Sequence, residues 1–452
     1  MIPDRLGPLV AETSEVAARF QAAGHPLYLV GGVVRDAILG RLAPGHDLDF
    51  TTSATPDEVE AVVAGWADAV WTQGKRFGTI GVRAPASAGG RNMEITTHRA
   101  EAYHPDSRKP DVRFAGAVEA DLSRRDFTVN AMALAVPELR LIDPFDGAAD
   151  LAAGRLRTPL APEVSFSDDP LRMLRAARFI AAYHLEPVPG IAEAVSGLRG
   201  RLEIVSEERI RAELDKLMVA EDPGPGLWFL IHTGLAEEFL PELPALGLEQ
   251  DPIHRHKDVL AHTVAVVQRT APDRILRLAA LLHDVGKPKT RSFGPGGTVS
   301  FHHHEVVGAR MARDRMRALR YPNDDVEAVT RLVELHLRFH TYRMGWTDSA
   351  VRRYVRDAGD LLDRLNQLTR ADCTTRNAAK ARALARRMDE LEARIAELRQ
   401  REQLAAIRPD LDGNAVMARL GLRPGPDVGR ALDYLLELRL EEGPLGEEEA
   451  GR

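Results

Sequence analysis

A glycine-broken segment near the N-terminus, LYLVGGVVRDAILGRLAPGHDLDFTT from Leu27 to Thr52, limits the possible folds of this chain most strongly. The apolar run Leu27–Val30 predicts a strand, the following glycine pair predicts a tight turn, and Val33–Leu39 has helical spacing. Glycines in such a turn let backbone N–H groups approach a phosphate, and a helix N-terminus favours its negative charge. The segment therefore predicts a strand, a phosphate-binding turn and a helix in succession.

Two carboxylates follow this predicted helix. Asp47 and Asp49 flank Leu48 in a run that predicts a second strand. Because residues i and i+2 of a strand point to the same side, we expect both carboxylates on one face. Paired carboxylates suit divalent metal ions that clamp the attacking and leaving oxygens of a phosphoryl transfer. An isolated Asp-x-Asp is usually a solvated turn, but the phosphate-binding turn just upstream favours the catalytic interpretation.

These residues resemble the polymerase-β-like nucleotidyltransferases, whose pattern is a Gly-Gly turn followed by Asp-x-Asp. The octamer RRDFTVNA at Arg124–Ala131 is similar to the second motif of their bacterial tRNA nucleotidyltransferase and poly(A) polymerase branch. Arginines can hold a triphosphate through paired hydrogen bonds, and a carboxylate and an amide can bind ribose hydroxyls. The segment GKRFGT at Gly74–Thr79 resembles the CCA-adding enzymes (class II) more than the poly(A) polymerases.

A third motif opens a predicted helix, with Asp168 as its expected N-cap and Pro170 in its first turn. In the family, an acid-acid-x-x-Arg motif reads the Watson–Crick edge of the incoming base, and here Asp169 and Arg172 occupy it. A carboxylate accepts a hydrogen bond from the amino group of cytosine or adenine, and a guanidinium donates to a ring nitrogen. The alternative interpretation is a surface ion pair beside a basic stripe.

Several other segments between residues 55 and 114 also give structural predictions. Pro56–Ala69 predicts a helix capped by Thr55, and Val70–Val82 predicts a strand. Glu94 is either a third carboxylate near the metals or a surface residue of a predicted strand. His98–Phe114 predicts a polar loop. Family members that add only cytidines are shortened in this loop, whereas this chain is not.

A second group of candidate site residues begins after a proline- and glycine-rich boundary near Gly247. His283 and Asp284 end an apolar predicted helix, with further histidines and aspartates before and after them. A lone histidine on an apolar helix is usually a core residue, but this grouping suits a metal cluster. The order resembles the HD phosphohydrolase superfamily. Hydrolysis does not follow from metal binding, because such domains also persist as scaffold, and Mn²⁺, Fe²⁺, Ni²⁺ and Mg²⁺ all stay open.

Composition excludes other classes of protein. The N-terminus lacks the apolar region of a signal peptide, and no stretch is long and apolar enough to span a bilayer. The single cysteine, Cys373, excludes an internal disulfide and suits a reducing cytoplasm. Because the net charge is −7, RNA must bind a local basic surface, for which the arginine-rich segment after Thr374 is a candidate. The end, EEGPLGEEEAGR, predicts a disordered acidic tail.

Together these features predict an α+β N-terminal nucleotidyltransferase domain, with a mixed sheet and helices, followed by all-α neck, HD and tail domains. We expect a catalytic head at 1–155, a helical neck with the base-reading motif at 156–247, an HD domain at 248–375, and a helical basic segment with an acidic tail at 376–452. The resemblance implies a cytoplasmic enzyme that adds C, C and A to tRNA from CTP and ATP by two-metal transfer, without a nucleic-acid template, a membrane or DNA. The alternatives are a poly(A) polymerase and an HD-type phosphohydrolase with a secondary transferase domain.

The expected site residues form three groups, and the oligomeric state stays open. The catalytic residues and Mg²⁺ ligands are Asp47 and Asp49. The nucleotide-binding residues are Gly31, Gly32, Arg35, Arg125, Asp126, Asn130, Asp169, Arg172, Arg175 and Arg178. The HD-site residues, expected to hold a divalent transition metal, are His262, His283, Asp284, His304, His336 and Asp372.

Overall fold

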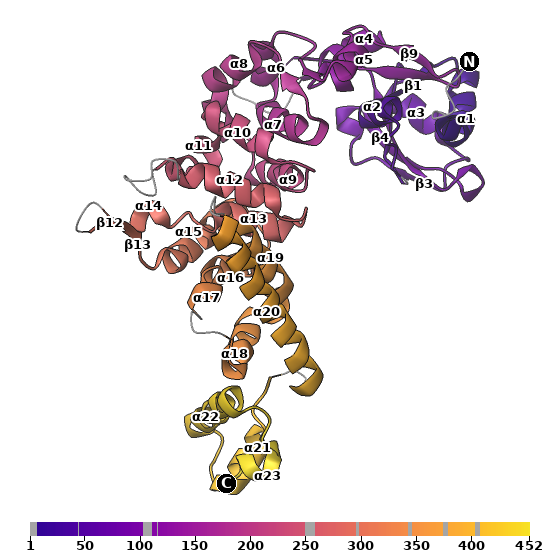
Figure 1. Ribbon diagram of the computed structural model, residues 1–452. Coiled ribbons are helices and arrows are strands. Elements are labelled where there is room, and N and C mark those ends of the chain that lie inside the picture. Colours follow the sequence, from indigo (N-terminus) through magenta and orange to yellow (C-terminus); the bar gives the residue numbers. More distant parts are fainter. Residues whose placement is uncertain are drawn as a thin grey trace. The chain divides into compact units, whose positions relative to one another are not determined.

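The computed structural model describes residues 7–43, 45–102, 111–114, 116–248, 258–294, 298–341, 346–373, 378–402 and 407–452. The chain divides into two compact units (Figure 1). The first unit comprises Met1–Leu217 and Pro225–Glu238, and the second comprises Met218–Gly224 and Phe239–Arg452. Each helix in the described ranges is too short or too polar to cross a lipid bilayer.

The first unit is built on a seven-stranded mixed sheet with the order β3-β4-β5-β2-β1-β8-β9 (Figure 1). Strands β2 and β5 run parallel, and the other neighbouring pairs are antiparallel. The strands are β1 (Leu27–Val30), β2 (Leu48–Thr52), β3 (Ala69–Trp71), β4 (Thr79–Arg83), β5 (Asn92–Thr97), β8 (Ala133–Val136) and β9 (Arg140–Ile142).

The pairing of β2 with β5 positions the acidic residues. In β2, Leu48 and Phe50 are buried, so the side chain of Asp49 between them points to the opposite face of the sheet. In β5, two buried residues flank Glu94 in the same way. The parallel register places Asp49 opposite Glu94, although 45 positions separate them in the chain.

Helices cover the sheet and continue into a helical neck. Helices α1 and α3 contact strands of the sheet, and the ring of Phe127 lies 5.2 Å from that of Phe179, which joins the head to α7. The helices are α1 (Gly7–Ala22), α2 (Gly32–Leu39), α3 (Pro56–Val63), α4 (Val118–Ser123), α5 (Gly147–Ala152), α6 (Pro162–Asp168), α7 (Leu171–Tyr183), α8 (Ile191–Leu198), α9 (Glu207–Met218), α10 (Gly224–His232) and α11 (Leu235–Phe239).

In its described residues, the second unit is helical apart from the hairpin β12 (Arg291–Phe293) and β13 (Val299–Phe301). Helix α13 is buried from Ile275 to Leu282 and packs against α12, α16 and α19. The helices are α12 (Val259–Arg269), α13 (Arg274–Leu282), α14 (Lys287–Thr290), α15 (His304–Ala318), α16 (Asn323–Leu335), α17 (Arg338–Thr341), α18 (Asp348–Ala358), α19 (Leu362–Asp372), α20 (Ala378–Glu402), α21 (Gly413–Leu420), α22 (Pro426–Glu442) and α23 (Gly446–Ala450). The predicted fold class, a mixed-sheet head followed by helical regions, is confirmed.

Some element boundaries in the head differ from the predictions. Thr55 caps α3 as expected, but α3 ends at Val63 because the chain turns there to enter β3. The predicted strand Val70–Val82 is two strands joined by a 3₁₀ turn at Lys75–Phe77. The predicted loop His98–Phe114 begins and ends in a paired hairpin, β6 (Arg99–Ala102) and β7 (Asp111–Phe114), and its residues 103–110 lie outside the described residues.

The predicted cap of α7 was wrong by one residue. Asp168 ends α6, and the side chain of Asp169 accepts the hydrogen bond from the backbone N–H of Leu171 at 3.2 Å. Asp169 precedes Pro170, and a residue before proline is biased away from the helical conformation. The break between α6 and α7 therefore falls at Asp169, which has φ −137° and ψ 99°.

The acidic C-terminus is not a disordered tail. Residues 446–450 form α23, and Ala450 packs against the apolar cluster between α21 and α22. The backbone N–H of Leu445 donates to Asp410 at 3.2 Å. Because the residues that make these few contacts lie among glutamates, the acidic composition of the segment led to the wrong prediction of disorder.

Candidate active site and metal cluster

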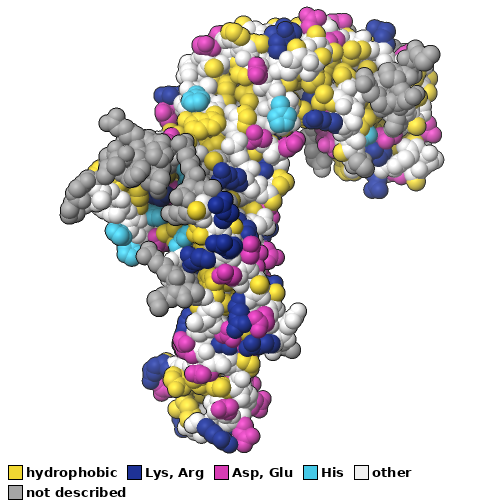
Figure 2. All heavy atoms as spheres, in the orientation of Figure 1, with side chains coloured by type: hydrophobic (Ala, Val, Ile, Leu, Met, Phe, Trp, Pro, Cys, Tyr) yellow, Lys and Arg dark blue, Asp and Glu magenta, His cyan; other side chains and the backbone are white. Residues whose placement is uncertain are grey.

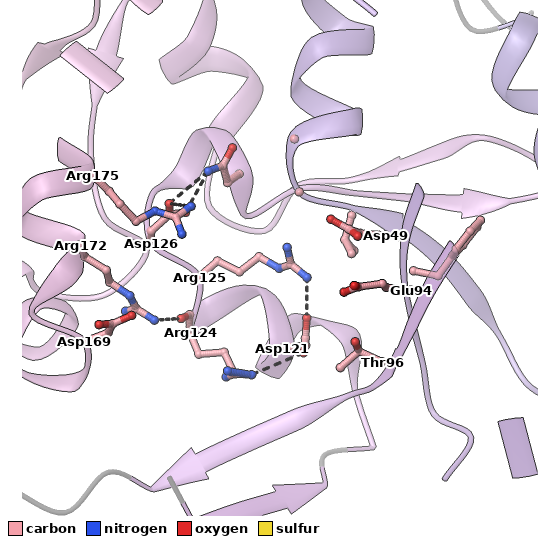
Figure 3. Close-up of a pocket in the computed structure, with 15 residues that line it drawn as sticks. Asp49, Glu94, Thr96, Asp121, Arg124, Arg125, Asp126, Asp169, Arg172 and Arg175 are labelled. Atoms are coloured by element: carbon pink, nitrogen blue, oxygen red, sulfur yellow. Dashed lines mark hydrogen bonds and ion pairs between the residues drawn. The ribbon is translucent and has the colours of Figure 1, made fainter. Parts of the chain in front are cut away.

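The first unit holds a cavity of about 420 Å³ between the sheet and the start of α7 (Figure 3). Asp49 and Glu94 lie on one side of it, and Asp169 and Arg172 lie on the other (Figure 3). The side chain of Arg125 extends between these two groups (Figure 3). The carboxylates and the Asp169–Arg172 pair therefore open into the same space.

The glycine turn forms part of the cavity wall. Gly31 and Gly32 both line it, at the N-terminus of α2. Gly31 has φ 77°, and a Cβ atom at this position would lie 3.2 Å from Nη1 of Arg125. A side chain here would strain the backbone and crowd the arginine, so glycine keeps the helix end open to an anion.

Three carboxylates meet at the edge of this cavity. Burial, followed by repulsion from Glu94 and Asp47, raises the pKa of Asp49 to about 6, and Arg125 opposes this shift. Asp47 lies just before β2 and lines an adjoining cavity together with Asp49 and Glu94. Carboxylate oxygens are preferred ligands of hard divalent cations, and a cation would relieve the repulsion that raises this pKa. The residues present therefore fit a divalent metal site.

Besides Glu94, two charged residues that line the cavity, Asp121 and Arg124, were absent from the predicted site residues. Asp121 forms an ion pair with Arg125 at 3.1 Å and lies 3.8 Å from Arg124. Arg124 and Asp121 both line the cavity. The helical spacing of Asp121, three and four residues before the two arginines, was the signal that could have identified it.

A buried network holds the rest of the second motif. Asp126 accepts hydrogen bonds from Asn130 at 3.0 Å and from the backbone of Phe127 at 2.8 Å, and it pairs with Arg175 at 2.5 Å. Burial alone raises the pKa of Asp126, but Arg175 and Asn130 outweigh it and hold that pKa below its usual value. Arg35 lies behind the wall and donates to Asn130 at 2.7 Å. It is thus placed to orient Asn130, whereas we expected direct contact with the nucleotide.

Asp169 and Arg172, the predicted base-reading pair, are held from separate directions. Asp169 pairs with Arg209 of α9 at 3.0 Å, while Arg172 donates to Ser165 Oγ at 2.9 Å and to the carbonyl of Arg124. Arg172 is buried yet lines the cavity. Arg178 is bound by Glu213 of α9 at 2.6 Å, outside the cavity wall. Helix α9 therefore supports α7 at two points.

The second unit brings the six predicted HD-site residues together. Asp284 lies at the centre, 3.2 Å from His283, 3.8 Å from His262 and 3.4 Å from His304. Nε2 of His262 lies 2.9 Å from Asp372, and Nε2 atoms of His304 and His336 are 3.3 Å apart. Two overlapping groups with metal-ligand geometry share Asp284: one with His262 and His283, the other with His304 and His336.

Hydrogen bonds orient the histidines of this cluster toward its centre. The Nδ1 atoms of His283, His304 and His336 lie 2.6 to 2.8 Å from backbone carbonyls. These Nδ1 atoms therefore donate to the carbonyls, and the Nε2 atoms face the centre of the cluster. Nε2 of His283 is buried and lies 3.2 Å from a carboxylate oxygen of Asp284 and 3.6 Å from one of Asp372. These inward-facing nitrogens and carboxylates fit a metal site.

The charges in the cluster also favour a cation. Burial alone lowers the pKa of His283, but Asp284 and Asp372 outweigh it and raise that pKa to about 10. Burial and the neighbouring charge of His283 lower the pKa of His336 to about 3. A bound metal ion would supply the positive charge that the proton on His283 supplies otherwise.

The fold and the cavity define a nucleotidyltransferase head joined to a helical region with an HD-type cluster. Residues 27–157 match the poly A polymerase head domain family, 185–246 match a probable RNA- and SrmB-binding site of polymerase A, and 258–398 match the HD domain family. The chain is 39% identical over 336 residues to the A-adding tRNA nucleotidyltransferase of Deinococcus radiodurans, covering 71% of this chain and 75% of that protein. It is 33% identical over 436 residues to the CC-adding tRNA nucleotidyltransferase of Thermus thermophilus, covering 94% and 91%.

The chain belongs to the bacterial tRNA nucleotidyltransferase family that includes the CCA-adding enzymes, as predicted. Its fold is that of the Bacillus stearothermophilus CCA-adding enzyme, solved in complex with CTP, with a TM-score of 0.67 at 23% identity over 99% of this chain and 96% of that one. The predicted HD domain is confirmed. Enzymes of this superfamily depend on divalent metal ions, and the carboxylates of β2 and β5 fit that requirement.

Proposed function

We propose that this enzyme adds C, C and A in turn to the 3′ end of tRNA from CTP and ATP. One observation carries the proposal: a single cavity joins the carboxylates of β2 and β5 to Asp169 and Arg172 on the neck. A nucleoside triphosphate that places its α-phosphate at Asp49 can direct its base toward α7. The site thus combines metal chemistry with selection of the base.

The proposed reaction is attack by the 3′ hydroxyl of tRNA on the α-phosphorus, which breaks the bond to pyrophosphate. Asp47 and Asp49, with Glu94, would hold Mg²⁺, which acidifies the attacking hydroxyl and neutralises charge on the leaving pyrophosphate. Arg124, Arg125 and the amides of the glycine turn bind the triphosphate. Asp126 and Asn130 hydrogen-bond the ribose hydroxyls, and their rigid network fixes the distance between phosphate and base.

Nucleotide choice is the open part of this proposal, because the relatives carry the names A-adding, CC-adding and CCA-adding. The unshortened segment 98–114 supports addition of all three nucleotides. Three tRNA substrates, ending before C, before CA and before A, separate the possibilities when the added nucleotides are sequenced. Extension of all three to CCA supports the proposal. Extension of one class only, or runs of A, would assign a CC-adding, A-adding or poly(A)-adding enzyme instead.

A second proposed activity is metal-dependent hydrolysis of phosphate esters at the HD cluster. The inward-facing Nε2 of His283 supports it, because Asp284 lies between histidines on both sides, and this set of ligands suits two divalent transition metal ions. Metal analysis of the purified protein and assays with phosphomonoesters and cyclic phosphodiesters test it. A folded protein without bound metal and without either activity would leave the domain as scaffold.

A further inference from the structure

Asp49 and Glu94 form the boundary between two cavities. The first is the 420 Å³ cavity that contains the arginines, and the second is a cavity of about 860 Å³ that also reaches Asp47. Apart from these carboxylates, the residues that line the second cavity are aromatic, apolar or uncharged. Such a lining repels a triphosphate and suits an uncharged planar group.

Two aromatic side chains are held in this second cavity. Trp71 of β3 lies opposite Gly81 of β4, and a Cβ atom on Gly81 would come within 3.1 Å of the indole ring. The ring therefore lies directly on the backbone of β4, while 40% of the residue stays exposed. Phe77 comes from the 3₁₀ turn between β3 and β4 and is partly buried. An exposed aromatic surface in a fixed position is a platform for stacking.

The turn that carries Phe77 is anchored to helix α3. Nζ of Lys75 lies 2.7 Å from Asp57 and 2.5 Å from Glu60.

A third cavity of about 320 Å³ shares Asp47 and Asn92 with the second and contains Arg83 and Arg91. From the third cavity through the second to the first, the lining is therefore cationic, then aromatic, then acidic at the shared carboxylates, and then cationic again. This order matches a backbone phosphate, a base, the metal site and a triphosphate.

We infer that the second cavity is the acceptor site, in which Trp71 and Phe77 stack on the 3′-terminal base of tRNA and Arg83 contacts a preceding phosphate. The inference rests on the proposed function. In-line phosphoryl transfer requires attacking and leaving oxygens on opposite sides of the α-phosphorus. Because the arginines place pyrophosphate in the first cavity, the hydroxyl enters from the second. Stacking tolerates any base, which suits an acceptor whose terminal base changes between additions.

The test is steady-state kinetics of the full-length enzyme with Trp71→Ala, Phe77→Ala and the conservative Trp71→Phe. Loss of one base–aromatic stack costs about fivefold to a hundredfold in binding, so each alanine variant should raise KM for tRNA by that factor. KM for CTP and ATP should stay unchanged, and Trp71→Phe should stay close to wild type. Tyr434→Ala, which removes a 68% exposed aromatic side chain from α22, is the matched control.

A tRNA that lacks its terminal base makes the test specific. With wild-type enzyme, removing that base should cost about as much as the Trp71→Ala, Phe77→Ala double substitution, and in that double variant it should cost little more. Gly81→Ala should act like Trp71→Ala because it displaces the ring. A folded double variant with wild-type KM for tRNA, or with the full penalty for the missing base, would overturn the inference. Failure of wild-type enzyme to extend intact tRNA would instead overturn the proposed function.

Discussion

Replacement of Asp169 by asparagine is the sharpest test of base reading by the protein. The amide keeps the size of the side chain, and its oxygen can still accept from the backbone of Leu171. It differs from the carboxylate because it also carries N–H donors. Those donors can bind the carbonyl oxygen that uracil or guanine presents where cytosine or adenine presents an amino group. We therefore expect Asp169→Asn to weaken discrimination against UTP and GTP, while Arg172 still opposes the ring N–H of uracil and guanine.

The contacts of Asp169 allow the expected loss of folding stability to be compared with the expected loss of base selectivity. The Asp169–Arg209 ion pair is partly exposed, with 26% and 45% of the side chains accessible, so its loss should cost less than about 1 kcal/mol of folding free energy. A good base contact is worth about 1–3 kcal/mol of discrimination, or roughly 5- to 150-fold. Selectivity should therefore change strongly while stability hardly changes. Arg172→Ala is less informative, because it removes buried hydrogen bonds to Ser165 and to the carbonyl of Arg124.

The assay is incorporation from mixtures of all four nucleotides into a tRNA that lacks its CCA end. Asp325→Asn is the matched control, because Asp325 pairs with Arg274 at 2.7 Å in the second unit and has 17% of its side chain exposed. Circular dichroism melting checks folding of both variants. If Asp169→Asn keeps the wild-type ratios of CTP and ATP over UTP and GTP at wild-type rates, Asp169 only pairs with Arg209 and does not read the base.

Further outcomes are expected at the carboxylates and at the HD cluster. Asp47→Ala or Asp49→Ala should abolish addition of both C and A while tRNA still binds in a gel-shift assay. Near-normal incorporation by either variant would show that these carboxylates do not hold the catalytic metal ions. Because the pKa of Asp49 is raised to about 6, its metal-binding form is lost as pH falls through 6, so addition at limiting Mg²⁺ should decline there. Saturating Mg²⁺ and Glu94→Gln should each move that decline to lower pH, and an unmoved profile would contradict this cause. His283→Ala with Asp284→Ala should eliminate bound transition metal and any phosphoesterase activity but spare CCA addition, and a parallel loss of addition in the folded variant would show that the sites are coupled.

Local sequence was sufficient to predict a feature when the residues that determine it are close together in the chain. The strand, glycine turn and helix of Leu27–Leu39 follow from an apolar run, two glycines and helical spacing, and the structure contains them as β1 and α2. The six predicted HD-site residues, which the structure brings together, could be picked out from sequence because they lie at the ends of helices or at polar positions in apolar helical runs. Figure 2 shows histidines exposed at the surface as well, so residue type without position would not have been enough.

Only the tertiary structure decided which charged residues face the cavity. The pairing of β2 with β5 brings Glu94 opposite Asp49, a long-range contact that no local period encodes. Five arginines were predicted to bind nucleotide, yet Arg125, Arg172 and Arg175 line the cavity, whereas Arg35 and Arg178 lie outside its wall and pair with Asn130 and Glu213. An arginine can bind a ligand only where the fold leaves its donors directed at open space. Whether its donors are free depends on partners that distant segments bring to it. The chemical type of each side chain was therefore predictable from sequence, whereas its freedom to bind a ligand was not.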